Sequence, residues 1–380
     1  MDFNFQGFFQ FCYRCLNSTR LNGRRILVLA AFFVFFPLLE TIIWIGFLWD
    51  NLFYARYRVQ VVNEPVFITG MFRSGTTFLH RLMAQDSKCF TSMAMWEILF
   101  APSIIQSRIV NALARPLSTP LNIFMDQIEA RWHQRNVMHR VSLREPEEDE
   151  YLLLHRWSTL TIGLSAGFLD EAMPYAYFDN QLPQWDKQRI MGFYRRCVQR
   201  YLFAHRTAQN LHYLAKNPAL CPKLNTLYES FPDAKIIYLV RSPLEVIPSF
   251  LSMMQFSWRV LGAPAEGSEL RDYLLRMARH WYDYPLHYLS KMPNDSYIIV
   301  NYDDLISDPS DTVRKIYKKL GLPLSVDFAQ ILQQEAEQGD VYHSRHDYSL
   351  ENLGLHREKI LEEFQDIFQR FGFDTEVPKR

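Results

Sequence analysis

One segment, FITGMFRSGTTFLHRL at residues 67–82, constrains the fold of this chain more than any other. It has the pattern of a short apolar strand, a loop that opens at Gly70, and a helix that starts at Thr76. Gly70 and Gly75 have the spacing of a P-loop, in which backbone N–H groups and a helix N-terminus hold an anion. The lysine that a nucleotide triphosphatase carries after the second glycine is replaced by Thr76, and Arg73 stands inside the loop.

The loop keeps the donors that a phosphate or sulfate needs without that lysine. Ser74, Thr76 and Thr77 supply hydroxyl groups, and Arg73 supplies a planar cation that can bind in a bidentate manner. Because a P-loop lysine reaches the β- and γ-phosphates, its absence argues against hydrolysis of ATP or GTP. We expect an anion site here. The alternative is a strand-to-helix turn that binds nothing.

Short apolar stretches at residues 66–69, 212–215, 235–240 and 297–301 alternate with helical patterns at 76–85, 187–210, 270–289 and 312–320. This alternation predicts an α/β fold, in which a P-loop-like parallel sheet has helices on both faces. The run IIYLV is apolar throughout, which is typical of a strand that is buried on both sides.

A second segment, FPDAKIIYLVRSPLEVIPSF, predicts a strand that ends at Arg241 and a helix that begins at Pro243. Ser249 lies eight residues after Arg241, two turns into that helix. Ligands of open α/β sheets bind at the carboxyl ends of the strands. We therefore expect Arg241 and Ser249 to converge beside the first loop and to hold a second, separate phosphate.

These two motifs together resemble those of the sulfotransferases. The resemblance runs from about Glu64 to Phe371, and its looser matches, at residues 146–150, 216–218 and 346–355, are similar to the bacterial-type branch. Sulfotransferases use 3′-phosphoadenosine 5′-phosphosulfate as the donor, and no metal. The resemblance implies that the donor is held by Arg73, Ser74, Gly75, Thr76, Thr77, Arg241 and Ser249. Such a donor has no γ-phosphate, which explains the missing lysine.

The resemblance also implies roles in the reaction. Arg73 stands where the family has a Lys or Arg that stabilises the leaving group. For the base that activates the acceptor hydroxyl, Glu97 is the first candidate, His139 the second and Glu148 the third. Glu97 could instead be a capping or surface carboxylate, and His139 an ordinary histidine. Lys216 could be only a lysine at the end of a strand.

One departure from the family concerns the cover over the adenosine. The soluble branch has a C-terminal loop with Gly and Trp at this place, and the present chain has no match. Arg345 and Tyr348 are the candidates to close over the donor instead.

Residues 26–48, ILVLAAFFVFFPLLETIIWIGFL, carry one charged residue, Glu40, and are long enough to cross a bilayer. Pro37 and Glu40 lie near the middle, where a carboxylate is costly in hydrocarbon. A membrane span, a bent, re-entrant or interfacial helix, and a buried helix therefore all remain open. We expect residues 1–60 to form a membrane-associated segment and residues 61–380 one catalytic domain. Only residues 49–65 separate the apolar run from the first strand, so the domain is expected to sit against the bilayer.

Composition narrows the classes of function. The charges of the 41 basic and 41 acidic residues cancel, and a net charge of zero argues against a nucleic-acid partner. The five cysteines are too few for a disulfide scaffold and favour the cytoplasmic side of a membrane, with a lumenal, Golgi-type location as the alternative. An aromatic content of 15%, the apolar stretches at residues 102–125 and 160–177 and the apolar lead segment together favour a lipid-like alcohol such as a sterol as the acceptor. A carbohydrate or protein-tyrosine acceptor, a kinase-like nucleotide-binding protein, and a binding protein that has lost the chemistry remain alternatives. The oligomeric state is not predicted.

Overall fold

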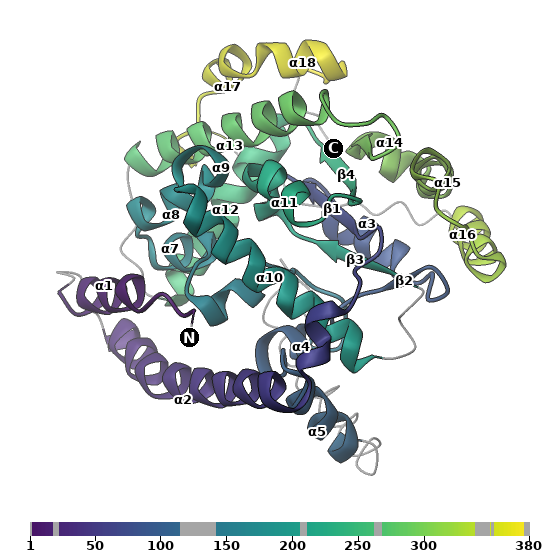
Figure 1. Ribbon diagram of the computed structural model, residues 1–380. Coiled ribbons are helices and arrows are strands. Elements are labelled where there is room, and N and C mark those ends of the chain that lie inside the picture. Colours follow the sequence, from purple (N-terminus) through teal and green to yellow (C-terminus); the bar gives the residue numbers. More distant parts are fainter. Residues whose placement is uncertain are drawn as a thin grey trace.

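The computed structural model describes residues 2–17, 23–114, 142–205, 211–261, 268–338, 350 and 353–375. Within these ranges a five-stranded sheet has the order β2-β3-β1-β4-β5, with neighbouring strands parallel (Figure 1). The strands are β1 (Val66–Gly70), β2 (Phe90–Thr91), β3 (His212–Lys216), β4 (Lys235–Val240) and β5 (Tyr297–Asn301). The predicted fold class is confirmed. The sequence reading missed β2, whose two residues are too few to show a strand pattern.

Helices surround this sheet (Figure 1). The first half of the described chain contains α1 (Phe5–Leu16), α2 (Gly23–Phe53), η1 (Ala55–Val59), α3 (Thr76–Met83), α4 (Met95–Phe100), α5 (Ile104–Ala114), η2 (Asp149–Arg156), α7 (Leu160–Ala166), α8 (Leu169–Ala176), α9 (Phe178–Gln181) and α10 (Gln184–Ala204). The second half contains η4 (Pro218–Lys223), α11 (Leu224–Ser230), α12 (Pro243–Leu261), α13 (Ser268–Leu289), α14 (Tyr302–Ser307), α15 (Pro309–Leu320), α16 (Val326–Gln338), α17 (Arg357–Glu363) and α18 (Gln365–Phe371).

Strand β4 shows how the sheet divides the core into two layers. Ile236, Tyr238 and Val240 belong to the larger hydrophobic core, which also includes residues of α10 to α13. Ile237 and Leu239 belong to the smaller core, which includes residues of α3, α14, α15 and α16. Because successive side chains of a strand point to opposite faces, β4 must be apolar on both sides. This requirement explains the run IIYLV.

The apolar run at residues 26–48 lies within α2, which is long and apolar enough to cross a membrane, with a mean hydropathy of 2.6. The helix lies along one side of the body (Figure 1). Ile43 and Phe47 pack in the same core as Phe67 of β1. The division of the chain near residue 60 therefore stays a prediction, and the two predicted parts share one hydrophobic core.

A buried histidine connects α2 to the rest of the chain. His155 Nδ1 lies 2.8 Å from Oε1 of Glu40, and its Nε2 donates to the carbonyl oxygen of Ile98 at 2.8 Å. The indole N–H of Trp44 donates to the backbone oxygen of His155 at 3.0 Å. One oxygen of the carboxylate near the middle of the apolar run is thus bound to a histidine inside the protein.

The acidic run at residues 146–150 is folded against the carboxyl end of β3. Glu148 lies 2.9 Å from the ammonium of Lys216, and Glu150 lies 2.7 Å from that of Lys223. Both lysines are fully buried. Asp149 accepts hydrogen bonds from the hydroxyls of Tyr194 and Tyr213, and desolvation by burial raises its pKa to about 6 despite these bonds. These buried charges depend on one another, since a charge without its partner is costly in the interior.

The first prediction concerns this network. Lys223→Met should lower the free energy of unfolding by about 3–5 kcal/mol, because it leaves Glu150 as a buried carboxylate without its cation. The measurement is the urea denaturation midpoint at unchanged m-value. Lys318→Met, at an exposed position of α15, is the matched control and should have little effect.

A double variant separates charge from packing. Lys223→Met with Glu150→Gln removes both charges and should recover part of the loss. An unchanged midpoint for Lys223→Met alone would contradict the role given to the network.

Candidate active site

The loop between β1 and α3 depends on two glycines that allow close approach of other groups. A Cβ atom on Gly70 would lie 2.5 Å from the carbonyl oxygen of Leu239, and one on Gly75 would lie 2.6 Å from the ring of Tyr302. Gly75 has φ of 91°, and Arg73 has φ of 72°. A left-handed conformation is unusual for a residue with a side chain, and such residues gather at ligand sites.

The two motifs predicted from the sequence meet at this loop. Arg73 Nε donates to Ser249 Oγ at 3.0 Å, and Arg241 Nη1 donates to the carbonyl oxygen of Arg73 at 3.0 Å. The guanidinium of Arg241 lies 3.9 Å from the ring centroid of Tyr302, and its Nε donates to Glu245 at 2.6 Å. Segments 168 residues apart thus place two guanidinium groups and a hydroxyl at one edge of the sheet.

Aromatic packing supports the loop from the side of the larger core. The ring of Phe72 stacks on Phe250, with centroids 4.8 Å apart, and on Trp281 at 5.2 Å. The indole N–H of Trp281 donates to the carbonyl oxygen of Ala176 at 2.9 Å. Phe250 follows Ser249 directly, so the same helix holds the loop and supplies a site residue.

The loop has donors suited to an anion. Ser74 is fully buried, and among the described residues its hydroxyl has no hydrogen-bond partner. An unsatisfied buried hydroxyl costs about 1–3 kcal/mol. The first N–H groups of α3, near Thr76 and Thr77, have no partner within their own helix. A phosphate or sulfate in the loop would satisfy these groups, so the residues present fit such a ligand.

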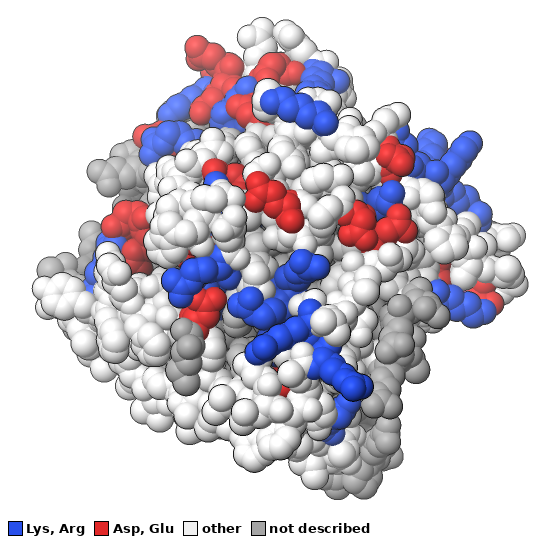
Figure 2. All heavy atoms as spheres, in the orientation of Figure 1, with Lys and Arg blue, Asp and Glu red and all other residues white. Residues whose placement is uncertain are grey.

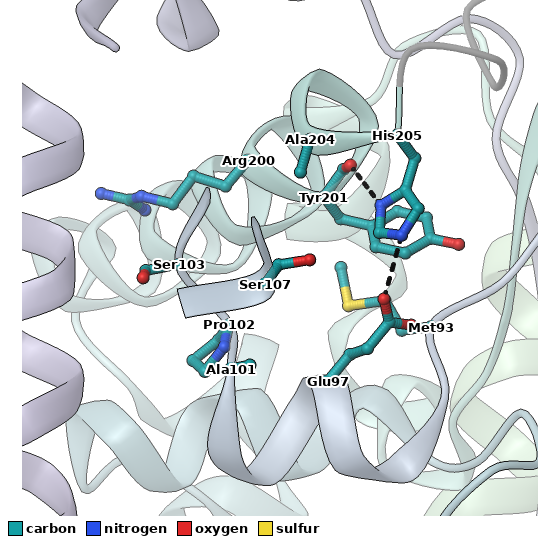
Figure 3. A pocket seen from close by; sticks show the side chains of 10 residues that line it. All are labelled: Met93, Glu97, Ala101, Pro102, Ser103, Ser107, Arg200, Tyr201, Ala204 and His205. Atoms are coloured by element: carbon teal, nitrogen blue, oxygen red, sulfur yellow. Dashed lines mark hydrogen bonds and ion pairs between the residues drawn. The ribbon is translucent and has the colours of Figure 1, made fainter. Parts of the chain in front are cut away.

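Glu97 occupies the third position of the short helix α4. Its Oε2 accepts the backbone N–H of Ala94 at 2.9 Å, and its Oε1 lies 3.1 Å from Nε2 of His205. One carboxylate oxygen of Glu97 therefore caps α4, as the alternative interpretation from the sequence predicted. The other faces a histidine across a pocket (Figure 3), whose lining includes Ser107, Arg200 and Tyr201.

The sequence reading missed His205, which directly follows α10. Its Nδ1 lies 3.0 Å from the carbonyl oxygen of Tyr201, which can only accept, so Nδ1 carries a proton. Its Nε2 lies 3.1 Å from Oε1 of Glu97, within the distance of an ion pair. Burial alone would lower the pKa of His205, but the hydrogen bond and the charge of Glu97 outweigh burial and raise this pKa above its ordinary value.

Of the other candidates, three fall outside the residues that the structure describes, and Glu148 and Lys216 are paired with each other. His139, Arg345 and Tyr348 lie outside the described residues. The carboxylate of Glu148 is bound to Lys216 at 2.9 Å, and Lys216 also lies 3.4 Å from Glu147. Lys216 is thus part of the buried network at the end of β3.

The second prediction concerns the Glu97–His205 pair. The pKa of His205 is raised in the folded chain. The pair therefore stabilises the fold fully when the pH is below about 6.5, the pKa of His205 in the unfolded chain. This stabilisation is lost as the pH rises through the higher pKa of the folded chain. His205→Gln should therefore lower Tm more at about pH 5.5 than at about pH 9. His287→Gln, at an exposed position of α13, is the control. A loss of Tm independent of pH would contradict the ion pair.

Comparisons with known proteins agree with this geometry. Residues 65–326 match the family described as the sulfotransferase family. Two curated relatives, from Mycobacterium bovis and Mycobacterium tuberculosis, carry the name omega-hydroxy-beta-dihydromenaquinone-9 sulfotransferase Stf3. Each is 24% identical over 346 residues, which cover 87% of this chain and 81% of the relative.

Solved structures show the same fold. Sulfotransferase STF1 from Mycobacterium tuberculosis has a TM-score of 0.66 and 23% identity, covering 83% of this chain and 80% of its own. Sulfotransferase STF9 from Mycobacterium avium has a TM-score of 0.67 and 17% identity, covering 88% of this chain and 83% of its own. At these identities the likeness concerns the fold.

Proposed function

This chain belongs to the sulfotransferase family, and on that premise we propose that it transfers a sulfuryl group from 3′-phosphoadenosine 5′-phosphosulfate to the hydroxyl of a lipid-like alcohol. The observation that carries the proposal is the meeting of Arg73, Arg241 and Ser249 at the carboxyl edge of the sheet. A donor with a phosphosulfate and a separate 3′-phosphate needs two neighbouring sets of cations and hydroxyls.

In this proposal the loop holds the 5′-phosphosulfate, and the start of α12 holds the 3′-phosphate. Ser74, Thr76 and Thr77 donate through hydroxyl and backbone N–H groups at the positive end of the α3 dipole. Arg241 and Ser249 supply a charged and a neutral donor for the 3′-phosphate. Arg73 connects the two sets of donors, since it belongs to the loop while its side chain contacts Ser249 and its carbonyl oxygen accepts from Arg241.

The reaction forms one bond and breaks one. The acceptor oxygen attacks the sulfur, and the bond between the sulfur and the bridging oxygen of the 5′-phosphate breaks. The electron pair of that bond stays on the leaving phosphate, where Arg73 and the N–H groups of the loop stabilise the developing charge. The proton of the acceptor hydroxyl passes to a base, for which Glu97 is the proposed residue.

The neighbours of Glu97 suit this role. The N–H of Ala94 and the imidazole of His205 fix the orientation of the carboxylate. A carboxylate has about four acceptor positions, so these contacts leave room for a substrate hydroxyl. The His205 side chain is 30% exposed, so it offers a path by which the proton can leave to water.

The lipid-like acceptor is supported by the surroundings of Glu97 and by the relatives. The lining of the pocket at Glu97 includes Met93, Ala101 and Pro102, and the nearby helix α5 exposes Ile109 and Leu113. The curated relatives are named for an omega-hydroxy dihydromenaquinone, which is an alcohol on an isoprenoid lipid. Mass identification of products after incubation of a lipid extract with labelled donor tests this assignment. A sulfated sugar or tyrosine as the main product would contradict it.

The third prediction concerns the donor. The protein should bind 3′-phosphoadenosine 5′-phosphate more tightly than ADP, and Arg241→Ala should weaken that binding by about 10- to 150-fold, the equivalent of ~1.5–3 kcal/mol for a charge-assisted hydrogen bond. Titration calorimetry measures both. Arg259→Ala, at an exposed position on the same helix, is the control. Equal affinity for the two nucleotides would contradict the donor assignment.

The fourth prediction concerns the base. Glu97→Gln should reduce turnover by at least about 100-fold, because an amide cannot accept the proton, while binding of 3′-phosphoadenosine 5′-phosphate stays unchanged. If Glu97→Gln retains turnover and His139→Ala abolishes it, the role of base passes to His139.

A further inference from the structure

From Arg25 onward, helix α2 has its charged residues turned toward the protein and its large exposed residues are apolar. Arg25, Glu40 and Asp50 are only 3%, 6% and 0% exposed. The exposed positions from residue 26 to residue 53 are apolar except Thr41, whose hydroxyl donates to the carbonyl oxygen of Pro37 at 2.7 Å. A surface helix in water has the opposite arrangement.

The inward face of α2 is attached along most of its length. Near its start, the rings of Phe32 and Phe36 pack against Trp157, with centroids 6.0 and 5.0 Å away. In the middle, Glu40 binds His155. The attached part, residues 32–50, is about 27 Å long at 1.5 Å per residue. A helix held side-on over that length does not leave the body to cross a bilayer.

At its C-terminal end α2 is held by a buried carboxylate. Asp50 accepts the N–H groups of Ile104 and Ile105, at 2.9 and 3.1 Å, and lies 3.2 Å from Nε of Arg200. Gln106 donates to the carbonyl oxygen of Ile42 at 2.9 Å. These contacts fix the rotation of α2 about its axis, so the same residues always face outward.

The outward face of α2 continues onto its two neighbours. Helix α1 packs on α2 through Phe8 and Phe36, with centroids 5.9 Å apart. Helix α5 packs beside the other end of α2. The apolar face, as we define it, comprises the large exposed residues of these three helices: Phe5, Phe9, Tyr13, Leu16, Ile26, Leu27, Val34, Phe35, Leu38, Ile42, Ile45, Leu48, Trp49, Leu52, Phe53, Ile109, Val110 and Leu113.

We propose that this apolar face is embedded in one leaflet of a lipid bilayer, with α1 and α2 lying in the plane of the membrane. An in-plane helix buries its apolar face about 5–10 Å deep at the boundary of headgroups and acyl chains. The inverted pattern of α2 suits a helix with lipid on one side and protein on the other. The inference stands whether or not the acceptor is a lipid.

The charges around the apolar face favour lipid over a protein partner. Exposed Arg24 precedes the apolar run, and exposed Arg56 and Arg58 follow it. Figure 2 shows a largely uncharged lower left margin over α2, and Lys and Arg side chains that gather in a band above it. Such a border matches the phosphates of anionic headgroups.

Membrane insertion is tested by flotation with vesicles of phosphatidylcholine and phosphatidylglycerol. The triple variant Val34→Lys, Leu38→Lys, Ile45→Lys should reduce the vesicle-bound fraction at least about tenfold, because three charges would enter the acyl region. Val326→Lys, at a position of α16 that is 73% exposed, is the matched control and should float like the unmodified chain. Binding of 3′-phosphoadenosine 5′-phosphate checks that the variants are folded.

The orientation of α2 is tested by labelling in sealed vesicles. Arg24→Cys and Arg58→Cys, each in a Cys12→Ser background, should both react with a membrane-impermeant maleimide from the outside. The other four native cysteines are buried. Labelling of only one of the two positions would show a span and overturn the proposal. Unchanged flotation of the triple variant would also overturn the proposal. So would an unmodified chain that does not bind vesicles and forms a dimer in solution, if the triple variant is a monomer.

Discussion

The candidate active site depends on how closely β1 and β4 approach at their carboxyl ends. Gly70 is paired with Leu239, and the space between them is too small for a Cβ atom on Gly70. Arg241 comes two residues after Leu239, so this approach brings its guanidinium to the backbone of Arg73. If β1 and β4 were further apart, the loop after β1 and the residues after β4 would form two separate anion sites, each with fewer donors. The observed separation makes one continuous array of donors.

Strand β3, the other neighbour of β1, is linked to a buried network of charged side chains. Ile68 is paired with Lys216, and the hydroxyl of Thr69 donates to the carbonyl oxygen of Asn217 at 3.0 Å. Lys216 and the amide of Asn217 in turn bind the acidic run that follows Pro146. The loop that starts at Gly70 is therefore positioned by close backbone packing on the side of β4 and by a buried ionic network on the side of β3.

Much of this arrangement could be predicted from the sequence, because it depends on local patterns and one rule of sheet topology. The strand-to-helix loop, the apolar strand before Arg241 and the direction of parallel strands together place Arg241 and Ser249 beside the loop. His205 could not be found in this way. It is a lone histidine after a helix, and only the packing of α10 beside α4 brings it to Glu97.

The position of α2 could not be predicted from the sequence for a different reason. Its hydropathy is the same whether it crosses a bilayer or lies on one, so composition could not decide between them. A signal was present in the spacing, since Glu40 and Asp50 are ten residues apart, about three turns, with Ile43 and Phe47 on the same side of the helix. Which side of the helix faces the protein became clear only when the contacts of His155 and Arg200 were known.

His155 also joins two helices of the molecule, α2 and α4. One ring nitrogen holds Glu40 of α2, and the other holds the carbonyl oxygen of Ile98, the residue next to Glu97 on α4. The imidazole is a rigid ring, so the separation between these two helices is set by its width and by two hydrogen bonds. A tilt or slide of α2 against the body cannot occur without moving α4 or breaking one of those bonds. The carboxylate of Glu97 is thereby held in register with α2.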